Sequence, residues 1–291
     1  MFQMPLSAQQ LKQYMDEGYL AVEDLFDPQA LAPLISEFEE AIDAKARELY
    51  KQSELKNLHE GASFERRLAL LCRDAEPAAE QELWLVGQGK HQKTAGMFAV
   101  WTQPALLDAV ERVIGPEILA HPQFNSRAKL PNQEETVVPW HQDIGYLERE
   151  ADDTFMVNFW IPLVDAPMET GALQVIPGSH RWDVLPHERI GSYDGLREES
   201  LPAHEVVDCP LNLGGALLIH SRTVHRSVVN TSDAVRWSLD LRYCDWREPT
   251  GRPDIPGFVA RSVAHPEKVA QSVEDWLALF SAEKAGDAYA G

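Results

Sequence analysis

Apolar residues recur at three- and four-residue intervals through the first part of the chain, a spacing that predicts amphipathic helices. Ser7 and Gln10 form a capping box, so we expect a helix to begin near Ala8. Gly18 is expected to end that helix, and residues 19–22 are predicted to form a short strand.

A second helix is predicted to start at Asp27 and Pro28, because proline suits the first turn of a helix. Its apolar residues repeat along one face: Leu31, Leu34, Ile35, Phe38 and Ile42. The polar segment 45–73 and the amphipathic segment 104–114 are also expected to be helical. The first 115 residues are therefore predicted to be mainly helical.

Beyond that point the pattern changes to alternation, which is typical of β-strands. In segment 154–163 one face is apolar, and Met156, Asn158 and Trp160 fall on the other. In segment 235–243 the split is cleaner, with apolar and polar side chains on opposite faces. The polar face of the second segment is either exposed to solvent or part of the lining of a barrel. Turn signals separate the strands, at residues 166–167, 169–171, 177–179 and 213–215. The pattern predicts an antiparallel barrel or jelly roll rather than alternating strands and helices.

The chain contains no repeat, linker or low-complexity tract, so we expect one domain over residues 1–291. Its fold class is predicted to be mainly β with flanking helices (α+β). The helix-rich part covers residues 1–115, the strand-rich core about 116–250, and a C-terminal loop and helix 251–291.

Composition and charge narrow the classes of function. Twenty-six Lys and Arg residues against 46 Asp and Glu leave a net charge of -20, which repels nucleic-acid phosphates and anionic membranes. No apolar stretch approaches the ~20 residues that span a bilayer. The N-terminus lacks the pattern of a secretory signal, and Cys72, Cys209 and Cys244 lack disulfide or zinc spacing. We therefore expect a cytoplasmic protein that binds neither nucleic acid nor membrane, with its oligomeric state left open.

The most informative short motif is Trp140-His141-Gln142-Asp143. On a strand, the imidazole of His141 and the carboxylate of Asp143 point to the same side, because they are two residues apart. A second histidine from another strand would complete two histidines and one carboxylate around a metal. Non-haem Fe(II) oxygenases use this set, which leaves three coordination positions open.

The strand-rich half offers five histidines as the third ligand: His180, His187, His204, His220 and His225. His225 is the best candidate, because it follows a predicted strand at 215–219 and precedes Arg236 by eleven residues. On the polar face of the next strand, the Arg236 guanidinium could bind a carboxylate through two hydrogen bonds. The rival to His225 is His220, and the alternative for Arg236 is an exposed strand residue.

With these residues in place, the chain resembles the phytanoyl-CoA dioxygenase family of Fe(II)- and 2-oxoglutarate-dependent oxygenases. The resemblance rests on an ordered set: His141 and Asp143, then His225 some 82 residues later, Ser227 two residues past it and Arg236 eleven past it. It extends over most of the chain, including Gly115-Pro116, Lys129 before Leu130-Pro131, the Phe159-Trp160 strand, segment 171–180 and Asn230.

The resemblance implies a double-stranded β-helix core (a cupin-like jelly roll) with a helical N-terminal part. It implies an Fe(II)- and 2-oxoglutarate-dependent dioxygenase that uses O2, hydroxylates a small-molecule metabolite and releases succinate and CO2. Because Asp143 is present, no position is free for a halide ligand, so halogenation is not expected. Desaturation, ring formation and epimerisation stay open as outcomes.

Residue by residue, the resemblance implies that His141, Asp143 and His225 bind Fe(II) and act as the catalytic centre. It implies that Arg236 pairs with the distal carboxylate of 2-oxoglutarate. Four further positions match residues near the co-substrate: Ser227, Trp160, Asn125 and Lys129.

Tyr146, Asn158 and Arg242 are the expected substrate contacts, and this mixed set suits a polar or amphipathic metabolite. Asp240 and Arg242 share the face of Arg236, and inside a barrel they would pair with each other or with substrate, since unpaired buried charge is costly. An acyl-CoA is not favoured, because the chain shows no dense cluster of Lys and Arg to receive its negative charges.

Two other functions compete with the oxygenase hypothesis. One is a cupin-like metalloenzyme that uses the same ligands without 2-oxoglutarate, and the other is a non-catalytic jelly-roll binding protein. Replacement of Arg236 distinguishes the first, because only an oxygenase would then need more 2-oxoglutarate. The complete ligand set weighs against the second. The acidic segment 148–153 is either a lid over the pocket or a solvated loop.

Overall fold

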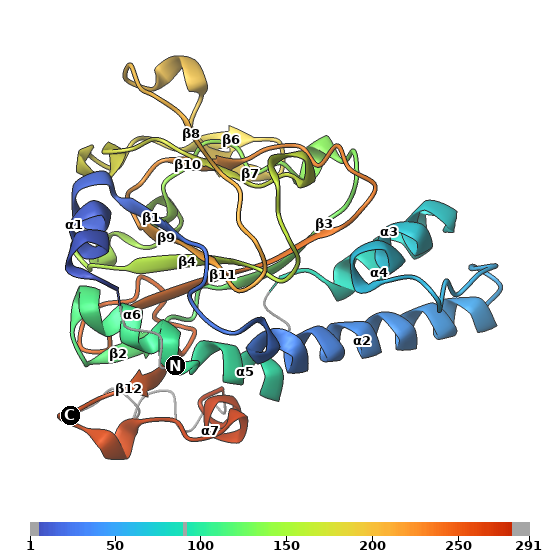
Figure 1. Ribbon diagram of the computed structural model, residues 1–291, viewed down its shortest axis with the longest axis horizontal. Helices are drawn as coiled ribbons and strands as arrows, with labels where there is room; N and C mark the ends of the chain where they lie inside the picture. Colours follow the sequence, from blue (N-terminus) through green and yellow to red (C-terminus); the bar gives the residue numbers. More distant parts are fainter. Residues whose placement is uncertain (1–5, 90–91, 281–291) are drawn as a thin grey trace.

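Two antiparallel sheets face each other in the computed structural model, which describes residues 6–89 and 92–280 (Figure 1). The larger sheet has the order β1 (Tyr19–Val22), β9 (Ala216–His220), β4 (Val157–Pro162), β11 (Arg236–Asp245), β2 (Ile118–Ala120) and β12 (Phe258–Arg261), with β3 (Asn125–Lys129) also paired to β11. The smaller sheet has the order β10 (His225–Ser227), β5 (Leu173–Val175) and β8 (Val207–Cys209). A separate hairpin joins β6 (Glu188–Ile190) to β7 (Tyr193–Gly195).

Helices lie against the outer side of the larger sheet and at its ends (Figure 1). The α-helices are α1 (Ala8–Glu17), α2 (Ala32–Lys51), α3 (Phe64–Asp74), α4 (Pro77–Val86), α5 (Ala95–Trp101), α6 (Pro104–Ile114) and α7 (Val273–Ala278). The 3-10 helices are η1 (Pro28–Leu31), η2 (Glu134–Thr136), η3 (Asp143–Tyr146), η4 (Arg149–Ala151), η5 (Met168–Thr170), η6 (Ser179–Arg181), η7 (Glu198–Ser200) and η8 (Pro266–Lys268). The predicted fold class, a jelly-roll core with a helical N-terminal part, is confirmed.

The capping box at the start of α1 forms as expected. The Ser7 hydroxyl accepts a hydrogen bond from Gln10 N, and the Gln10 side chain accepts one from Ser7 N. Gly18 ends α1 in the left-handed conformation, with φ of 76°. Because Gly18 N still donates to Tyr14 O, the chain turns directly from α1 into β1.

Segment 45–73, which we expected to be helical, is helical only at its two ends. Helix α2 ends at Lys51, and α3 begins only at Phe64. Between them Ser53 and His59 have φ angles of 66° and 46°, which a right-handed helix does not allow. The second helix also starts with a 3-10 turn, in which the Asp27 carboxylate accepts from Gln29 N.

The main core lies between the larger sheet and the helices. The apolar side chains of β11 face this core, and the Trp237 ring stacks on Phe64 and packs against Phe38. The polar side chains of β11 therefore face the space between the two sheets. Of the two alternatives left by the sequence, the barrel lining is the one observed.

No helix within residues 6–89 and 92–280 combines the length and the apolar character that crossing a membrane requires.

Candidate active site

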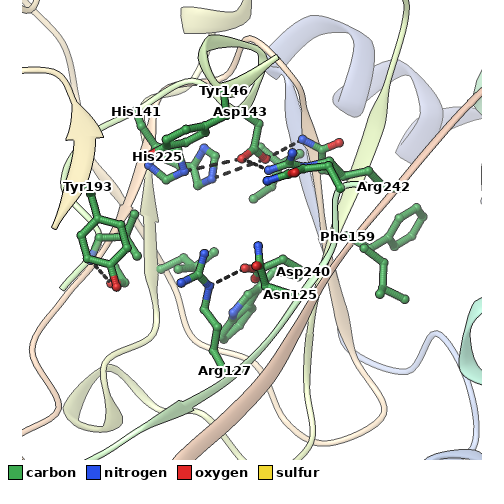
Figure 2. Close-up of a pocket in the computed structure, with 18 of the residues that line it drawn as sticks. Asn125, Arg127, His141, Asp143, Tyr146, Phe159, Tyr193, His225, Asp240 and Arg242 are labelled. Carbon is green, nitrogen blue, oxygen red and sulfur yellow. Dashed lines mark hydrogen bonds and ion pairs between the residues drawn. The ribbon is translucent and has the colours of Figure 1, made fainter. Parts of the chain in front are cut away.

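A cavity of about 240 Å³ lies between the two sheets. Its lining includes every residue that the sequence singled out as a site residue except Lys129. Figure 2 shows His141, Asp143 and His225 together at one end of the pocket, and Arg127, Asp240 and Asn125 at the other. Phe159 points away from the centre, into the core behind the larger sheet.

His141, Asp143 and His225 bring one ligand atom each to within 4.8 Å of one another. The Asp143 carboxylate lies 3.6 Å from His141 Nε2 and 3.9 Å from His225 Nε2. The structure thus groups the predicted ligands and leaves the rival His220 outside, at the end of β9, where its ring packs on Phe155 and His180.

The local backbone of the two neighbouring ligands differs from the expectation. His141 pairs with His225 in an isolated bridge, with N···O distances of 3.0 Å in both directions, whereas Asp143 opens η3 instead of continuing a strand. Between them, Gln142 is held by the backbone of Asp183, Leu185 and Arg222. These three contacts tie the chain down at the point where it turns, so the ligand spacing is kept without a strand.

Both imidazoles are oriented by backbone carbonyls. His141 Nδ1 lies 2.9 Å from Pro139 O, and His225 Nδ1 lies 2.9 Å from Thr223 O. A proton on each Nδ1 leaves the Nε2 lone pair free toward the carboxylate. Burial, with a further contribution from His141, lowers the pKa of His225 to about 4, so this imidazole is neutral at pH 7. Two imidazoles, each with its Nε2 toward the carboxylate, fit a divalent metal ion at this spacing.

The Asp143 carboxylate is held by two further side chains. Arg242 Nη2 donates to Oδ1 at 2.5 Å, and Asn158 Nδ2 donates to Oδ2 at 2.6 Å. Burial acts to raise the pKa of Asp143, but the Arg242 guanidinium and the two imidazoles outweigh it and hold that pKa well below its ordinary value. The carboxylate is therefore ionised and fixed in orientation, as a metal ligand must be.

Of the two partners expected for Asp240 and Arg242, each other or a substrate, pairing with each other is not observed. Asp240 accepts from Arg127 Nε at 2.5 Å, and Arg242 binds Asp143 instead. Arg127 lies on β3, which pairs with β11 so that Asn125 is directly opposite Asp240. Arg127 lies two residues from both Asn125 and Lys129 on β3, and its partner depends on the pairing of β3 with β11.

Arg236 is 2% exposed and lies at the start of β11, six residues before Arg242. Its Nη1 donates to Ser238 Oγ at 2.7 Å, its guanidinium lies 5.4 Å from the Trp160 ring centroid, and its Nε is buried without a partner. Within the described ranges it forms no ion pair, and burial lowers its pKa to about 10. A buried guanidinium without a carboxylate is arranged to receive one from a ligand.

Ser227 lies beside Arg236 in the cavity lining, and Lys129 lies behind Ser227. Ser227 Oγ accepts hydrogen bonds from Lys129 Nζ at 2.8 Å and from Val138 N at 2.9 Å. Burial, together with the charge of Arg236, lowers the pKa of Lys129 to about 6. Because Ser227 accepts twice from the protein, its own hydroxyl proton is left to donate into the cavity.

Two tyrosines cover the cavity. Tyr146 packs its ring 5.5 Å from that of His141 and donates its hydroxyl to Asp194 O at 2.5 Å. Tyr193 reaches the cavity from the β6–β7 hairpin, a contribution that the sequence analysis did not foresee (Figure 2). None of residues 148–153 is part of the lining, so the cover comes from Tyr146 and the hairpin and not from the acidic segment.

The sequence profile of phytanoyl-CoA dioxygenase (PhyH) matches residues 14–238. The chain belongs to the phytanoyl-CoA dioxygenase family. The predicted resemblance is confirmed, and with it the predicted class of enzyme, a 2-oxoglutarate-dependent non-haem iron dioxygenase. The matched range, residues 14–238, contains all three grouped ligands as well as Arg236.

Among curated relatives, phytanoyl-CoA dioxygenase domain-containing protein 1 of Danio rerio is 29% identical over 260 residues, which cover 79% of this chain and 87% of that protein. Among solved structures, the non-heme alpha ketoglutarate dependent epimerase SnoN from nogalamycin biosynthesis is 23% identical, with a TM-score of 0.56 over 85% of this chain and 89% of SnoN. EctD from S. alaskensis, solved with 2-oxoglutarate and 5-hydroxyectoine, is 20% identical, with a TM-score of 0.57 over 85% of this chain and 79% of EctD. The structural likeness confirms the fold that the family shares.

Proposed function

We propose that this family member hydroxylates a small molecule, with Fe(II), O2 and 2-oxoglutarate, and releases succinate and CO2. The observation that carries the proposal is that one cavity joins a buried set of two histidines and one aspartate to a buried arginine that has no ion-pair partner in the part of the chain that the structure describes. The metal set without the arginine would equally suit a cupin-like enzyme that needs no keto acid. Arg236 therefore favours the oxygenase over that alternative.

His141, Asp143 and His225 would hold the iron, and three protein ligands leave positions for the keto acid and for dioxygen. The bound iron supplies the redox chemistry that couples oxidation of the keto acid to oxidation of the substrate. The protein supplies the positioning. Arg242 and Asn158 fix the orientation of the Asp143 carboxylate, and the backbone carbonyls of Pro139 and Thr223 fix the imidazoles.

Arg236 would bind the distal carboxylate of 2-oxoglutarate, and Ser227 would donate its hydroxyl proton to the same group. Trp160 and Asn125 would line the path between that carboxylate and the metal. Lys129 would act from behind Ser227, through their hydrogen bond of 2.8 Å. Burial of Arg236, Ser227 and Trp160 strengthens the attraction between guanidinium and carboxylate, because little water competes for either.

We expect the primary substrate to contact Tyr146, Asn158 and Arg242, which line the metal end of the cavity. SnoN is named as an epimerase, and EctD was solved with a hydroxylated compound, so members of this fold differ in the outcome of the reaction. We favour hydroxylation for this chain. Product analysis with an accepted substrate tests this choice against epimerisation or desaturation.

We also propose that the chain forms a single dioxygenase domain over residues 1–291 and that it acts in the cytoplasm. The three cysteines are free and buried, which suits a reducing compartment.

The first experiment adds Fe(II) and 2-oxoglutarate to metal-free protein without oxygen and records the weak visible band of a keto acid chelated to iron. We expect the band with the native protein and no band with Asp143→Ala. On admission of air, succinate should form only when both Fe(II) and 2-oxoglutarate are present. Binding of Fe(II) without a band at any concentration of 2-oxoglutarate would contradict the oxygenase proposal and favour the cupin-like enzyme.

A further inference from the structure

We infer that the primary substrate is a small monoanion, bound at its anionic group by Arg242 and at a neighbouring hydrogen-bond donor by Asn158. The inference rests on the proposed function, since it assigns a substrate class to the same cavity. It is carried by two unpartnered polar atoms at the metal end and by the balance of charge around the whole cavity.

Arg242 is 4% exposed and presents an unused donor to the cavity. Its Nη2 is taken by Asp143, but its Nη1 is buried and has no hydrogen-bond partner among residues 6–89 and 92–280. A buried guanidinium nitrogen without an acceptor is unfavourable, and a ligand oxygen is the natural way to satisfy it. Because the acceptor would face a cation in a dry site, an anionic oxygen binds there more strongly than a neutral one.

Asn158 offers an acceptor atom that complements the Arg242 Nη1 donor. Its Nδ2 is taken by Asp143, whereas its Oδ1 is buried without a partner. Asn158 and Arg242 are directly opposite each other in the pairing of β4 with β11, so their side chains lie next to each other on the face toward the cavity. An acceptor beside a cationic donor suits a ligand that carries a hydroxyl, amine or amide close to its anionic group.

The charges around the cavity lead to the same conclusion. The lining contains three guanidinium groups, those of Arg127, Arg236 and Arg242, and two carboxylates, those of Asp143 and Asp240. Fe(II) and the 2-oxoglutarate dianion add charges that cancel. One positive charge then stays unbalanced in a buried site, although the chain as a whole carries a net charge of -20. A substrate with a single negative charge restores neutrality.

The size of the cavity limits the class of substrate further. The cavity of about 240 Å³ also has to hold the co-substrate, and it is smaller than the roughly 300–1,000 Å³ of pockets for drug-sized ligands. A coenzyme A thioester carries several negative charges, more than the one unbalanced positive charge. The inference is therefore a compact oxyanion, such as a hydroxy- or amino-substituted carboxylate.

The test uses matched pairs of probes: straight-chain monocarboxylates of two to six carbons, each beside its primary amide. Each probe is titrated into the anaerobic protein loaded with Fe(II) and 2-oxoglutarate, and the shift of the visible band reports binding near the metal. We expect the best carboxylate to bind at least about tenfold more tightly than its amide.

This preference for the carboxylate over the amide should fall below about twofold in Arg242→Gln and persist in part in Arg242→Lys. Arg247→Gln, a change to an exposed arginine just beyond β11, should leave it unchanged. Equal binding of carboxylates and amides by the native protein would overturn the inference.

A second measurement needs no metal and separates the inference from the proposed function. Calorimetric titration of the best monocarboxylate is carried out on metal-free Arg236→Gln and on the double variant Arg236→Gln, Arg242→Gln. We expect the single variant to bind the carboxylate, because the Arg242 site is intact, and the double variant to lose this binding. Equal affinity in both variants would overturn the inference even if the loaded protein forms its band. Absence of the band in the native protein would count against the proposed function alone, and the metal-free result would still decide on Arg242.

Discussion

The two ends of the cavity differ in how their buried charged groups are paired. At the metal end, comprising the three ligands with Arg242 and Asn158, the carboxylate accepts from a guanidinium and an amide within the protein. At the Arg236 end, comprising Arg236, Ser227, Lys129 and Trp160, two buried basic groups lie on neighbouring positions of β11 and β3, and neither forms an ion pair within residues 6–89 and 92–280.

The difference matches what each end has to bind: a metal ion at the metal end and a charged ligand at the Arg236 end. A metal ligand has to be oriented before the metal arrives, so its partners belong to the protein. A binding site for a dianion gains affinity when a buried guanidinium such as that of Arg236 is left without an ion-pair partner, because the ligand then supplies the missing charge. The cost of leaving Arg236 and Lys129 uncompensated appears as lowered pKa values, about 10 and about 6.

Removal of a ligand from the metal end should have the largest effect. Asp143→Ala should weaken Fe(II) binding by more than about 100-fold, beyond the 10- to 100-fold that loss of an outer partner costs. Equilibrium titration of Fe(II) without oxygen measures the change. Asp153→Ala, which removes an exposed carboxylate, is the matched control. Retained Fe(II) affinity in Asp143→Ala would place the metal elsewhere.

Removal of the guanidinium at the other end should leave the metal in place and affect only the co-substrate. Arg236→Gln should raise the KM for 2-oxoglutarate by roughly 30- to 1,000-fold, which corresponds to about 2–4 kcal/mol for a buried charge pair. Fe(II) affinity measured without 2-oxoglutarate should stay within about twofold of the native value. Arg247→Gln controls for loss of an arginine in general. If the KM is unchanged, the two ends do not have the separate roles given to them here.

Loss of an outer partner at the metal end should have a smaller effect of the same kind. Asn158→Ala removes the hydrogen bond of 2.6 Å to Asp143 and should weaken Fe(II) binding by about 10- to 100-fold, with a smaller change in the KM for 2-oxoglutarate. Asn212→Ala, an exposed position, serves as control. The comparison fails if the KM changes more than the metal affinity does.

Lys129 should give the Arg236 end its own pH signature. The pKa of this amine is about 6 in the folded protein, against 10.5 for an ordinary lysine, so between these values the unfolded chain binds more protons than the folded one. Stability of the metal-free protein should therefore rise with pH in that window and decline as the pH falls toward 6.

Lys129→Met should flatten this rise by up to about 1.4 kcal/mol per pH unit. Urea unfolding at pH 6.5, 7.5 and 8.5 measures the slope, and Lys12→Met, at an exposed position, should leave it unchanged. Equal slopes for the native protein and Lys129→Met would mean that Lys129 stays charged and has a partner.

Much of the fold could be predicted because its signals are local. The capping box at Ser7, the left-handed glycine at position 18 and the alternation along 235–243 each depend on neighbours in sequence, and the structure contains all three. The break between α2 and α3 could not be predicted. Segment 52–63 leaves the helix with positive φ at two residues and buries Leu55, and that burial depends on packing against distant parts of the chain.

The candidate site likewise has one part that the sequence predicted and one part that it could not predict. The order and spacing of His141, Asp143, His225 and Arg236 carried the resemblance to the family, and that resemblance implied the metal set although Asp143 does not lie on a strand. The sequence by itself therefore determined the class of chemistry. Only the tertiary structure decided which charges are paired: Arg242 meets Asp143 from 99 residues away, and Arg127 meets Asp240 from 113 residues away. Which carboxylate a guanidinium reaches depends on strand neighbours and register, and periodicity along one strand carries no information about either.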